Sequence, residues 1–144
     1  METLLVTGGA GFIGSTFAKR AMDKGYQIRV IDNLSTGISE VASELRNMDI
    51  DVIIGDVRDS VLLETVMKDV DVVVHLAAQV SVPISVENPD ETASINIEGT
   101  NALLSKCSKF GIKRFILASS AAVYGDNENL PLIEKDSGTL LSPY

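Results

Sequence analysis

Three glycines spaced three residues apart follow a short apolar run near the start of the chain, and they constrain the fold more than any other feature. The run, residues 4–7, is typical of a buried parallel strand. Gly8 permits a tight turn off that strand, Gly11 lets backbone N–H groups approach a pyrophosphate, and Gly14 lets a following helix pack close to the sheet. The helix N-terminus directs its partial positive charge at the phosphates. The pattern therefore predicts a dinucleotide-binding turn.

The residues that follow the glycines complete a strand–helix–strand unit. Residues 26–31 predict a second strand, which leads directly into Asp32. A glycine-rich turn that binds no ligand is the alternative, and the flanking strands and the acidic residue disfavour it. Between the strands, apolar residues recur at helical spacing and Gly25 provides a C-terminal stop; the apolar residues are Phe12, Ile13, Phe17 and Ala21.

Asp32 is the predicted determinant of cofactor choice. A carboxylate at the end of the second strand can accept two hydrogen bonds from the adenine ribose hydroxyls, and it repels a 2′-phosphate. No arginine stands beside Asp32 or in the glycine turn to receive such a phosphate. We therefore expect NAD rather than NADP. The alternative is that Asp32 serves only as a turn former ahead of Asn33.

The composition predicts one globular domain, residues 1–144. Hydrophobic residues make up 45% of the chain and charged residues 22%, which is typical of a folded protein with a core. The net charge of −8 argues against nucleic acid or an anionic membrane as a partner. Because there is no signal-peptide pattern and no apolar run of roughly 18 residues, we expect a cytoplasmic protein without a membrane span. A single cysteine, Cys107, and a single histidine, His75, exclude a disulfide framework and a metal site of several imidazoles.

Helical and strand patterns alternate along the rest of the chain. Strands that are separated by helices pair in parallel through right-handed crossovers, which favours a doubly wound α/β sheet of order 3-2-1-4-5 with its ligand at the carboxyl ends of the strands. Small or polar residues occupy those ends: Gly8, Asp32, Asp56, Ala77, Ala78, Ser119 and Ser120. We predict helices at residues 38–46, 59–67 (capped by Asp59 or Ser60) and 92–110 (ended by Gly111), strands at residues 50–54, 70–76 and 113–119, and a loop around Pro83 and Pro89.

Motifs along the whole chain resemble those of the extended short-chain dehydrogenase/reductases, and within them those of the nucleotide-sugar 4-epimerases. The resemblance implies a Rossmann fold, NAD as cofactor, a UDP-sugar as substrate and a homodimer in the full-length protein. The segments that carry it are residues 7–14 (TGGAGFIG), 32–37 (DNLSTG), 55–59 (GDVRD), 75–79 (HLAAQ), 96–100 (NIEGT) and 119–125 (SSAAVYG).

The resemblance also implies roles for individual residues. Ser120 and Tyr144 would be catalytic, with Ser120 bonded to the sugar 4-hydroxyl and Tyr144 as the tyrosine of a Tyr-x-x-x-Lys motif. Ser81 and Val82 would lie on the substrate side, as in the branch that acts on UDP-N-acetylhexosamines. His75, at a strand end, is expected to be structural rather than an acid–base group. Cofactor contacts would come from Gly8, Gly11, Phe12, Ile13, Gly14, Asp32, Asn33, Ser35, Thr36, Gly37, Asp56, Val57, Leu76, Ala77, Ala78, Gln79, Asn96 and Ser119.

These residue types suit the transient oxidation of a secondary alcohol. That reaction needs a base at the hydroxyl while a hydride leaves for the nicotinamide. The pKa of a tyrosine is ordinarily about 10, and a nearby lysine and the cationic nicotinamide lower it. The family's 4,6-dehydratases and decarboxylases typically carry an acidic residue two places before the tyrosine of the Val-Tyr-Gly segment, where this chain has Ala122. The resemblance therefore favours 4-epimerisation, in which the hydride returns to the opposite face of the sugar.

The lysine of the Tyr-x-x-x-Lys motif would stand at position 148, beyond Tyr144. We therefore expect this chain to be the cofactor-binding part of a longer epimerase, with an incomplete sheet, no activity on its own, and apolar residues 115–117 left uncovered. Two alternatives remain open. One is a stand-alone NAD-binding module without catalysis, and the other is a different extended short-chain nucleotide-sugar oxidoreductase or dehydratase.

Overall fold

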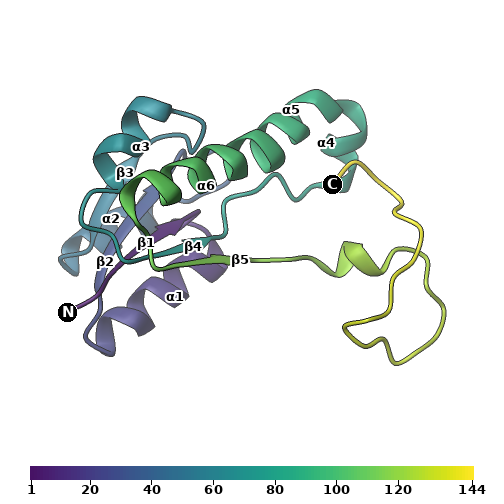
Figure 1. The fold of residues 1–144 in the computed structure, drawn as a ribbon, viewed down its shortest axis with the longest axis horizontal. Helices are drawn as coiled ribbons and strands as arrows, with labels where there is room; N and C mark the ends of the chain where they lie inside the picture. Colours follow the sequence, from purple (N-terminus) through teal and green to yellow (C-terminus); the bar gives the residue numbers. More distant parts are fainter.

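A parallel five-stranded sheet lies between two layers of helices (Figure 1) in the computed structural model, which describes residues 1–144. The predicted strand order 3-2-1-4-5 is confirmed. Thr7 lies opposite both Ile31 and His75, so neighbouring strands end level and the loops that follow them meet at one edge. The strands, in order across the sheet, are β3 (Asp51–Ile54), β2 (Gln27–Asp32), β1 (Thr3–Thr7), β4 (Val72–His75) and β5 (Arg114–Leu117).

The helices alternate with the strands along the chain. They are α1 (Phe12–Asp23), α2 (Ser39–Asn47), α3 (Ser60–Val66), α4 (Val82–Glu87), α5 (Pro89–Ala93) and α6 (Gly99–Phe110), with a π-helical segment η1 (Ser94–Glu98) between α5 and α6 and a 3₁₀ turn η2 (Ala121–Tyr124) after β5. Asp59 caps α3, as predicted, because its carboxylate accepts hydrogen bonds of 2.9 and 3.0 Å from the N–H groups of Val61 and Leu62. Gly111 ends α6 with a left-handed φ of 66°, also as predicted.

The predicted loop around Pro83 and Pro89 is wrong, because each proline lies in the first turn of a helix. A proline is tolerated there, since the N–H that it lacks would have no intrahelical partner. Ser81 caps α4 by accepting a bond of 3.4 Å from the N–H of Ile84. The helix predicted at residues 92–110 is also corrected: helical structure begins at Pro89, and η1 interrupts it.

The central strands β1 and β4 are buried on both faces, as expected of a doubly wound fold. Side chains alternate along a strand, so Leu4 and Val6 of β1 share one core with Ala18 of α1. Leu5 points the other way and shares a second core with Leu103 of α6. Helices on both faces of the sheet therefore pack against β1, and this packing holds the glycine turn that follows β1 in place.

The predicted apolar face of α1 needs correction at its N-terminal end. Phe12 and Ile13 are 91% and 66% exposed, whereas Ala18 is fully buried. The cause is the close approach of α1 to the sheet, which only small residues allow. A Cβ at Gly14 would collide with the backbone oxygen of Gly8. The two large side chains of the first turn therefore lie at the surface, on the wall of an apolar groove that α1 forms with β1, β4 and β5.

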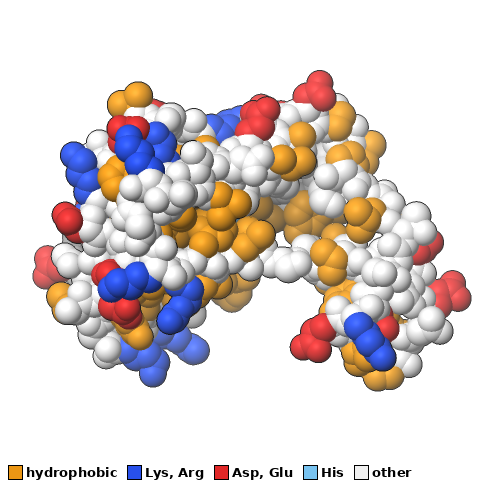
Figure 2. Space-filling model, viewed as in Figure 1, with side chains coloured by type: hydrophobic (Ala, Val, Ile, Leu, Met, Phe, Trp, Pro, Cys, Tyr) orange, Lys and Arg blue, Asp and Glu red, His pale blue; other side chains and the backbone are white.

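β5 carries the apolar surface that the sequence predicted. Ile116 is 45% exposed and Leu117 is 57% exposed. Ile116 lines an apolar groove of about 550 Å³ that β1, β4 and β5 form beside α1. Phe115 departs from the prediction, because it points to the opposite face and packs against the core beneath α6. Figure 2 shows hydrophobic side chains gathered in the middle of the face that carries β5.

Beyond β5 the chain leaves the sheet and folds back on itself (Figure 1). The return is held by a bond of 2.8 Å from the N–H of Thr139 to the carboxylate of Asp126, and by one of 3.3 Å from the amide of Asn127 to the carbonyl of Ser137. This fold-back carries the last residues to the strand ends. Among the helices of the structure, none combines the length and the apolar character needed to span a bilayer.

Candidate cofactor cleft and catalytic pair

A cleft of about 680 Å³ lies at the carboxyl ends of the strands. Residues that follow all five strands contribute to its walls, so it crosses the full width of the sheet, roughly 19 Å at the usual strand spacing. Most of the predicted site residues line it: Gly8, Gly11, Phe12, Ile13, Gly14, Asp32, Asn33, Ser35, Thr36, Gly37, Asp56, Val57, Leu76, Ala77, Ala78, Gln79, Ser119, Ser120 and Tyr144.

Three predicted residues lie outside the lining of this cleft: Asn96 in η1, and Ser81 and Val82 at the start of α4. Sequence reasoning also missed eight lining residues, which are Ile31, Gly55, His75, Val80, Ile95, Thr100, Leu117 and Ala118. Gly55 and Ala118 directly follow strands, which is a signal that could have found them. Ile95 and Thr100 face the cleft from η1 and α6, and no local pattern predicts the π-helical turn that sets their direction.

The glycine turn presents free backbone donors to the cleft. Gly8 has a left-handed φ of 68°, a conformation that glycine adopts readily. The N–H groups of Phe12, Ile13 and Gly14, in the first turn of α1, donate to no protein acceptor. A Cβ added at Gly11 would meet only the oxygen of Gly8, at 3.3 Å. The turn therefore combines unpaired N–H groups, a helix N-terminus and open space, which suits an anionic group.

The carboxylate of Asp32 is fixed by the backbone around it. Its two oxygens accept hydrogen bonds of 2.8 Å from the N–H groups of Ala10 and Leu34. A Cβ at Gly37 would lie only 2.5 Å from one of these oxygens, so the loop after β2 closes tightly over the acid. Each carboxylate oxygen keeps a further lone pair for a ligand. Asp32 is thus an oriented acceptor at the end of β2, in the place the sequence predicted.

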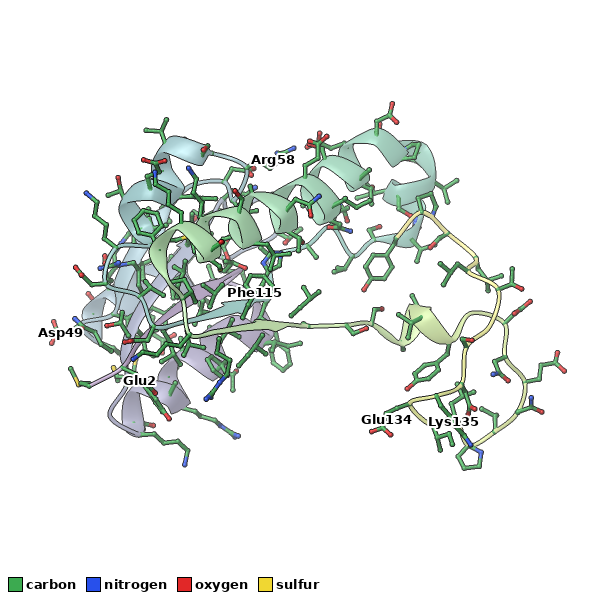
Figure 3. The ribbon with its side chains drawn as sticks, in the orientation of Figure 1. Glu2, Asp49, Arg58, Phe115, Glu134 and Lys135 are labelled. Carbon is green, nitrogen blue, oxygen red and sulfur yellow. The ribbon has the colours of Figure 1, made fainter.

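Asp56 is the centre of a charged network that the sequence did not predict. The guanidinium of Arg58 donates to both of its oxygens at 2.9 Å, and the amide of Asn33 donates to one of them at 3.0 Å. These bonds hold the pKa of the Asp56 carboxyl far below its ordinary range, so it stays ionised. Arg58 also donates to Glu91 of α5 at 2.9 Å. It lies between α3 and α5 (Figure 3), and so links Asp56, in the turn after β3, to α5.

His75 and Asn96 are held by complete sets of hydrogen bonds. The two ring nitrogens of His75 lie 2.7 and 2.9 Å from the hydroxyls of Thr7 and Thr100. Burial lowers the pKa of this imidazole to about 4, and the prediction that His75 is structural agrees with both observations. The amide of Asn96 accepts from the N–H of Gln79 at 2.8 Å and donates to its carbonyl at 3.0 Å. Asn96 thus steadies the site through the backbone of Gln79.

Ser120 and Tyr144 meet at the end of the cleft that lies beyond β5. The tyrosine hydroxyl donates a hydrogen bond of 2.9 Å to Oγ of Ser120. Ser120 is held in turn as the cap of η2, since its Oγ also accepts from the N–H of Ala122 at 3.1 Å. A hydroxyl pair at one end of the cleft and the carboxylate of Asp32 toward the other give a site with two chemically different ends.

A family model described as the NAD dependent epimerase/dehydratase family matches residues 4–144. The chain belongs to this family. The predicted resemblance and the predicted cofactor class, NAD, are thereby confirmed at the level of the family. One relative, the UDP-glucose 4-epimerase of Halalkalibacterium halodurans, is 37% identical over 143 residues, which are 98% of this chain and 41% of that protein.

Solved structures of epimerases match the same fold. The UDP-N-acetylglucosamine 4-epimerase from Methanobrevibacter ruminantium M1, in complex with UDP-N-acetylmuramic acid, is 40% identical with a TM-score of 0.90, over 99% of this chain and 46% of that one. The UDP-glucose 4-epimerase from Bifidobacterium longum, in complex with NAD⁺ and UDP, is 34% identical with a TM-score of 0.92, over 99% of this chain and 44% of that one. This chain spans less than half the length of these relatives.

Proposed function

We propose that residues 1–144 form the NAD-binding domain of a UDP-sugar 4-epimerase that interconverts UDP-glucose or UDP-N-acetylglucosamine with its 4-epimer. The observation that carries the proposal is the contact of Ser120 with Tyr144 in the same cleft that holds Asp32. Hydroxyls that can reach a substrate alcohol and a carboxylate that can hold a ribose are the groups that a reversible sugar oxidation needs. We further propose that the complete protein is a homodimer.

The residues present fit a dinucleotide along the whole cleft. The free N–H groups at the start of α1 suit the pyrophosphate, and the three residues that carry them line the cleft. Asp32 suits the adenine ribose, and Asp56, whose carboxylate already accepts four hydrogen bonds from Arg58 and Asn33, would lie beside the adenine. The nicotinamide end of the ligand would then lie toward Ser120 and Tyr144.

The chain's own residues would prepare the substrate alcohol for oxidation at C4. NAD, when bound, supplies the hydride acceptor and later the hydride donor. Tyr144 would take the proton of the sugar 4-hydroxyl, while Ser120 holds the same oxygen by a hydrogen bond. In the return step Tyr144 would give the proton back to the C4 oxygen as carbon C4 receives hydride on its opposite face. Ser81 and Val82, which follow the cleft residues Gln79 and Val80, would contribute to the sugar side.

One observation favours the second candidate function, an NAD-binding module without catalysis. No hydrogen bond or ion pair joins a lysine to Tyr144 or Ser120 in the structure. A tyrosine hydroxyl without a nearby cation is a weak base at neutral pH, since its ordinary pKa is about 10. The 144-residue chain would in that case bind NAD without catalysing a reaction.

The protein expressed from the complete reading frame decides between the two functions. We expect it to interconvert UDP-glucose with UDP-galactose, or UDP-N-acetylglucosamine with UDP-N-acetylgalactosamine, as followed by chromatography of the two epimers. Tight NAD binding with no conversion of either pair would support the module and contradict the epimerase. Light scattering of the same preparation tests the homodimer, which a monomeric mass would contradict.

A further inference from the structure

A chain of hydrogen bonds runs from β1 to η1 through the one histidine of the sequence, and two of its members, His75 and Thr100, line the cleft. It begins at Thr7, a fully buried residue at the end of β1. The hydroxyl of Thr7 accepts bonds of 3.1 Å from the N–H groups of both Leu76 and Ala77. The N–H of Leu76 is shared with the carbonyl of Thr7, at 3.3 Å, and that of Ala77 has no other acceptor; with both N–H groups on its oxygen, the Thr7 hydroxyl donates its own O–H to Nδ1 of His75, which lies at 2.7 Å. Nδ1 is therefore an acceptor and carries no proton.

The bonds of Thr100, at the other end of this series of hydrogen bonds, independently show whether the second ring nitrogen of His75 carries a proton. The hydroxyl of Thr100 donates to the backbone carbonyl of Asn96 at 2.6 Å. Its O–H is thus committed, and at 2.9 Å from Nε2 of His75 it can only accept. Both ends lead to the same neutral tautomer, with the proton on Nε2. A second proton on Nδ1 would find no lone pair left on Thr7, and the side chain of His75 is 2% exposed, so water cannot replace that partner.

Hydrogen bonds at the two ends of this series, from Thr7 and from Asn96, hold one loop of the cleft. Residues 76–79 follow β4 and all four line the cleft. Thr7 binds the N–H groups at the start of this loop, and Asn96 binds both backbone groups of Gln79 at its end. The loop lies against the glycine turn, because a Cβ at Gly8 would stand 2.9 Å from the backbone nitrogen of Ala77. His75 is the only side chain that connects the Thr7 bonds with the η1 side.

We propose that His75 is a positioning residue for the dinucleotide: as the neutral Nε2–H tautomer it connects Thr7 to Thr100, and so sets the distance between the loop of residues 76–79 and the glycine turn. This inference rests on the proposed NAD site. It adds to that proposal a relay, Thr7–His75–Thr100, which acts through the backbone of residues 76–79. The relay ends in η1, because the hydroxyl of Thr100 donates to the carbonyl of Asn96, four residues earlier.

The tautomer can be measured directly, because the chain has one histidine. In protein grown with ¹⁵N-labelled histidine, long-range ¹H–¹⁵N correlation spectra contain a single imidazole. We expect a protonated Nε2 and an unprotonated Nδ1 at pH 7, and the same pattern after NAD is added. A protonated Nδ1, or an average of the two tautomers, would overturn the relay whether or not NAD binds.

The coupling to the cofactor is tested by a matched pair of substitutions at Thr100. Thr100→Val keeps the shape but removes the hydroxyl, and leaves Nε2–H of His75 and the carbonyl of Asn96 without their partner. We expect its Kd for NAD, measured by calorimetry, to rise about tenfold, since a lost buried hydrogen bond costs on the order of 1.4 kcal/mol. Thr100→Ser restores the hydroxyl and should restore most of the affinity.

A merely structural role would give a different result. A variant that is destabilised but still folded at the assay temperature, as its circular dichroism would show, should bind NAD as the unmodified chain does. Equal Kd values for Thr100→Val, Thr100→Ser and the unmodified chain would therefore overturn the positioning role while leaving the NAD site intact. If Thr100→Val does not fold, His75→Asn and His75→Gln, which keep only the Nδ1-side or only the Nε2-side bond, test the same link. Failure of the unmodified chain to bind NAD would instead contradict the proposed function itself.

Discussion

The hydroxyl of Tyr144 donates a hydrogen bond of 2.9 Å to Oγ of Ser120, which is 24 residues earlier in the chain. Oγ of Ser120 accepts a second bond from the N–H of Ala122, so its own O–H stays free. A free O–H on a fixed serine is suited to hold the oxygen of a substrate alcohol, with the tyrosine hydroxyl adjacent to take its proton. The fold-back of residues 126–139 brings the two groups together, although neither lies in a strand or an α-helix.

The first prediction concerns the base. In the protein expressed from the complete reading frame, Tyr144→Phe removes the hydroxyl and keeps the ring. We expect kcat for UDP-sugar interconversion to fall by about 10²–10⁴-fold, the usual contribution of a positioned acid–base group, with NAD still bound. Ser120→Ala should lower kcat less, because it removes the positioning bond and leaves the base. A Tyr144→Phe enzyme with unchanged turnover would contradict the assigned base.

The second prediction concerns cofactor choice at Asp32. The chain should bind NAD more tightly than NADP, by about tenfold or more, because the 2′-phosphate of NADP would face a carboxylate held in place by Ala10 and Leu34. Asp32→Ala should weaken NAD binding and reduce the difference in affinity between NAD and NADP. Asp23→Ala, which removes the same charge from an exposed position of α1, is the control and should leave the ratio unchanged. Equal affinity for both cofactors in the unmodified chain, by calorimetry, would refute the assignment.

A third prediction separates two glycines of the same turn. Gly11→Val should abolish NAD binding and shift the melting temperature by only a few degrees. The added side chain would occupy phosphate space, and its Cβ would meet only the oxygen of Gly8, at 3.3 Å. Gly14→Val should instead prevent stable folding, because its Cβ would collide with that oxygen. Normal NAD affinity in a folded Gly11→Val chain would show that the phosphate site has been misplaced.

A fourth prediction concerns the uncovered surface of β5. The 144-residue chain should self-associate as its concentration rises, because Ile116 is 45% exposed on an edge strand beside an apolar groove. Ile116→Lys should lower the association without changing NAD affinity, since this residue does not line the cofactor cleft. Sedimentation velocity measures the effect. If the unmodified chain sediments as a monomer at every concentration, the predicted self-association is wrong.

Much of the fold could be predicted from the sequence because the signals are local. Apolar runs mark the strands of a parallel sheet, and parallel strands place their carboxyl ends at one edge. Asp32, Ser119 and Ser120 could therefore be assigned to one site from their positions alone, and the structure places all three on one cleft. The glycine turn was predictable for the same reason, since its backbone conformation and close packing require glycine at particular positions.

The remaining features depend on contacts between distant segments. The link from Arg58 to Glu91 joins residues 33 positions apart, and no local pattern shows it. Phe12 looks like part of an apolar helix face, but the close approach of α1 to the sheet leaves it 91% exposed. The π-helical turn at Ser94–Glu98 has no recognised sequence signal, yet it decides that Ile95 and Thr100 face the cleft.

The last prediction concerns the effect of pH on stability through His75. Burial lowers the pKa of its imidazole from an ordinary 6.5 to about 4 in the folded chain. Between these values the unfolded chain binds a proton that the folded chain does not, so the free energy of unfolding should fall as the pH falls from 6.5 to 4. At 1.36 kcal/mol per unit the loss reaches roughly 3 kcal/mol, and above pH 6.5 this group has no effect.

Urea denaturation at a series of pH values measures this slope. Carboxyl groups with lowered pKa values, such as Asp56 and Asp71, lose their stabilising interactions only at more acidic pH, so they do not obscure the upper part of the window. His75→Phe removes the titrating group, and its unfolding free energy should be flat from pH 6.5 to 5 whatever its absolute value. NMR titration of the single imidazole gives the folded pKa directly. A midpoint near 6.5 in the folded chain would show that the protonated ring is not disfavoured in the fold, and it would contradict both the burial argument and the closed set of bonds around His75.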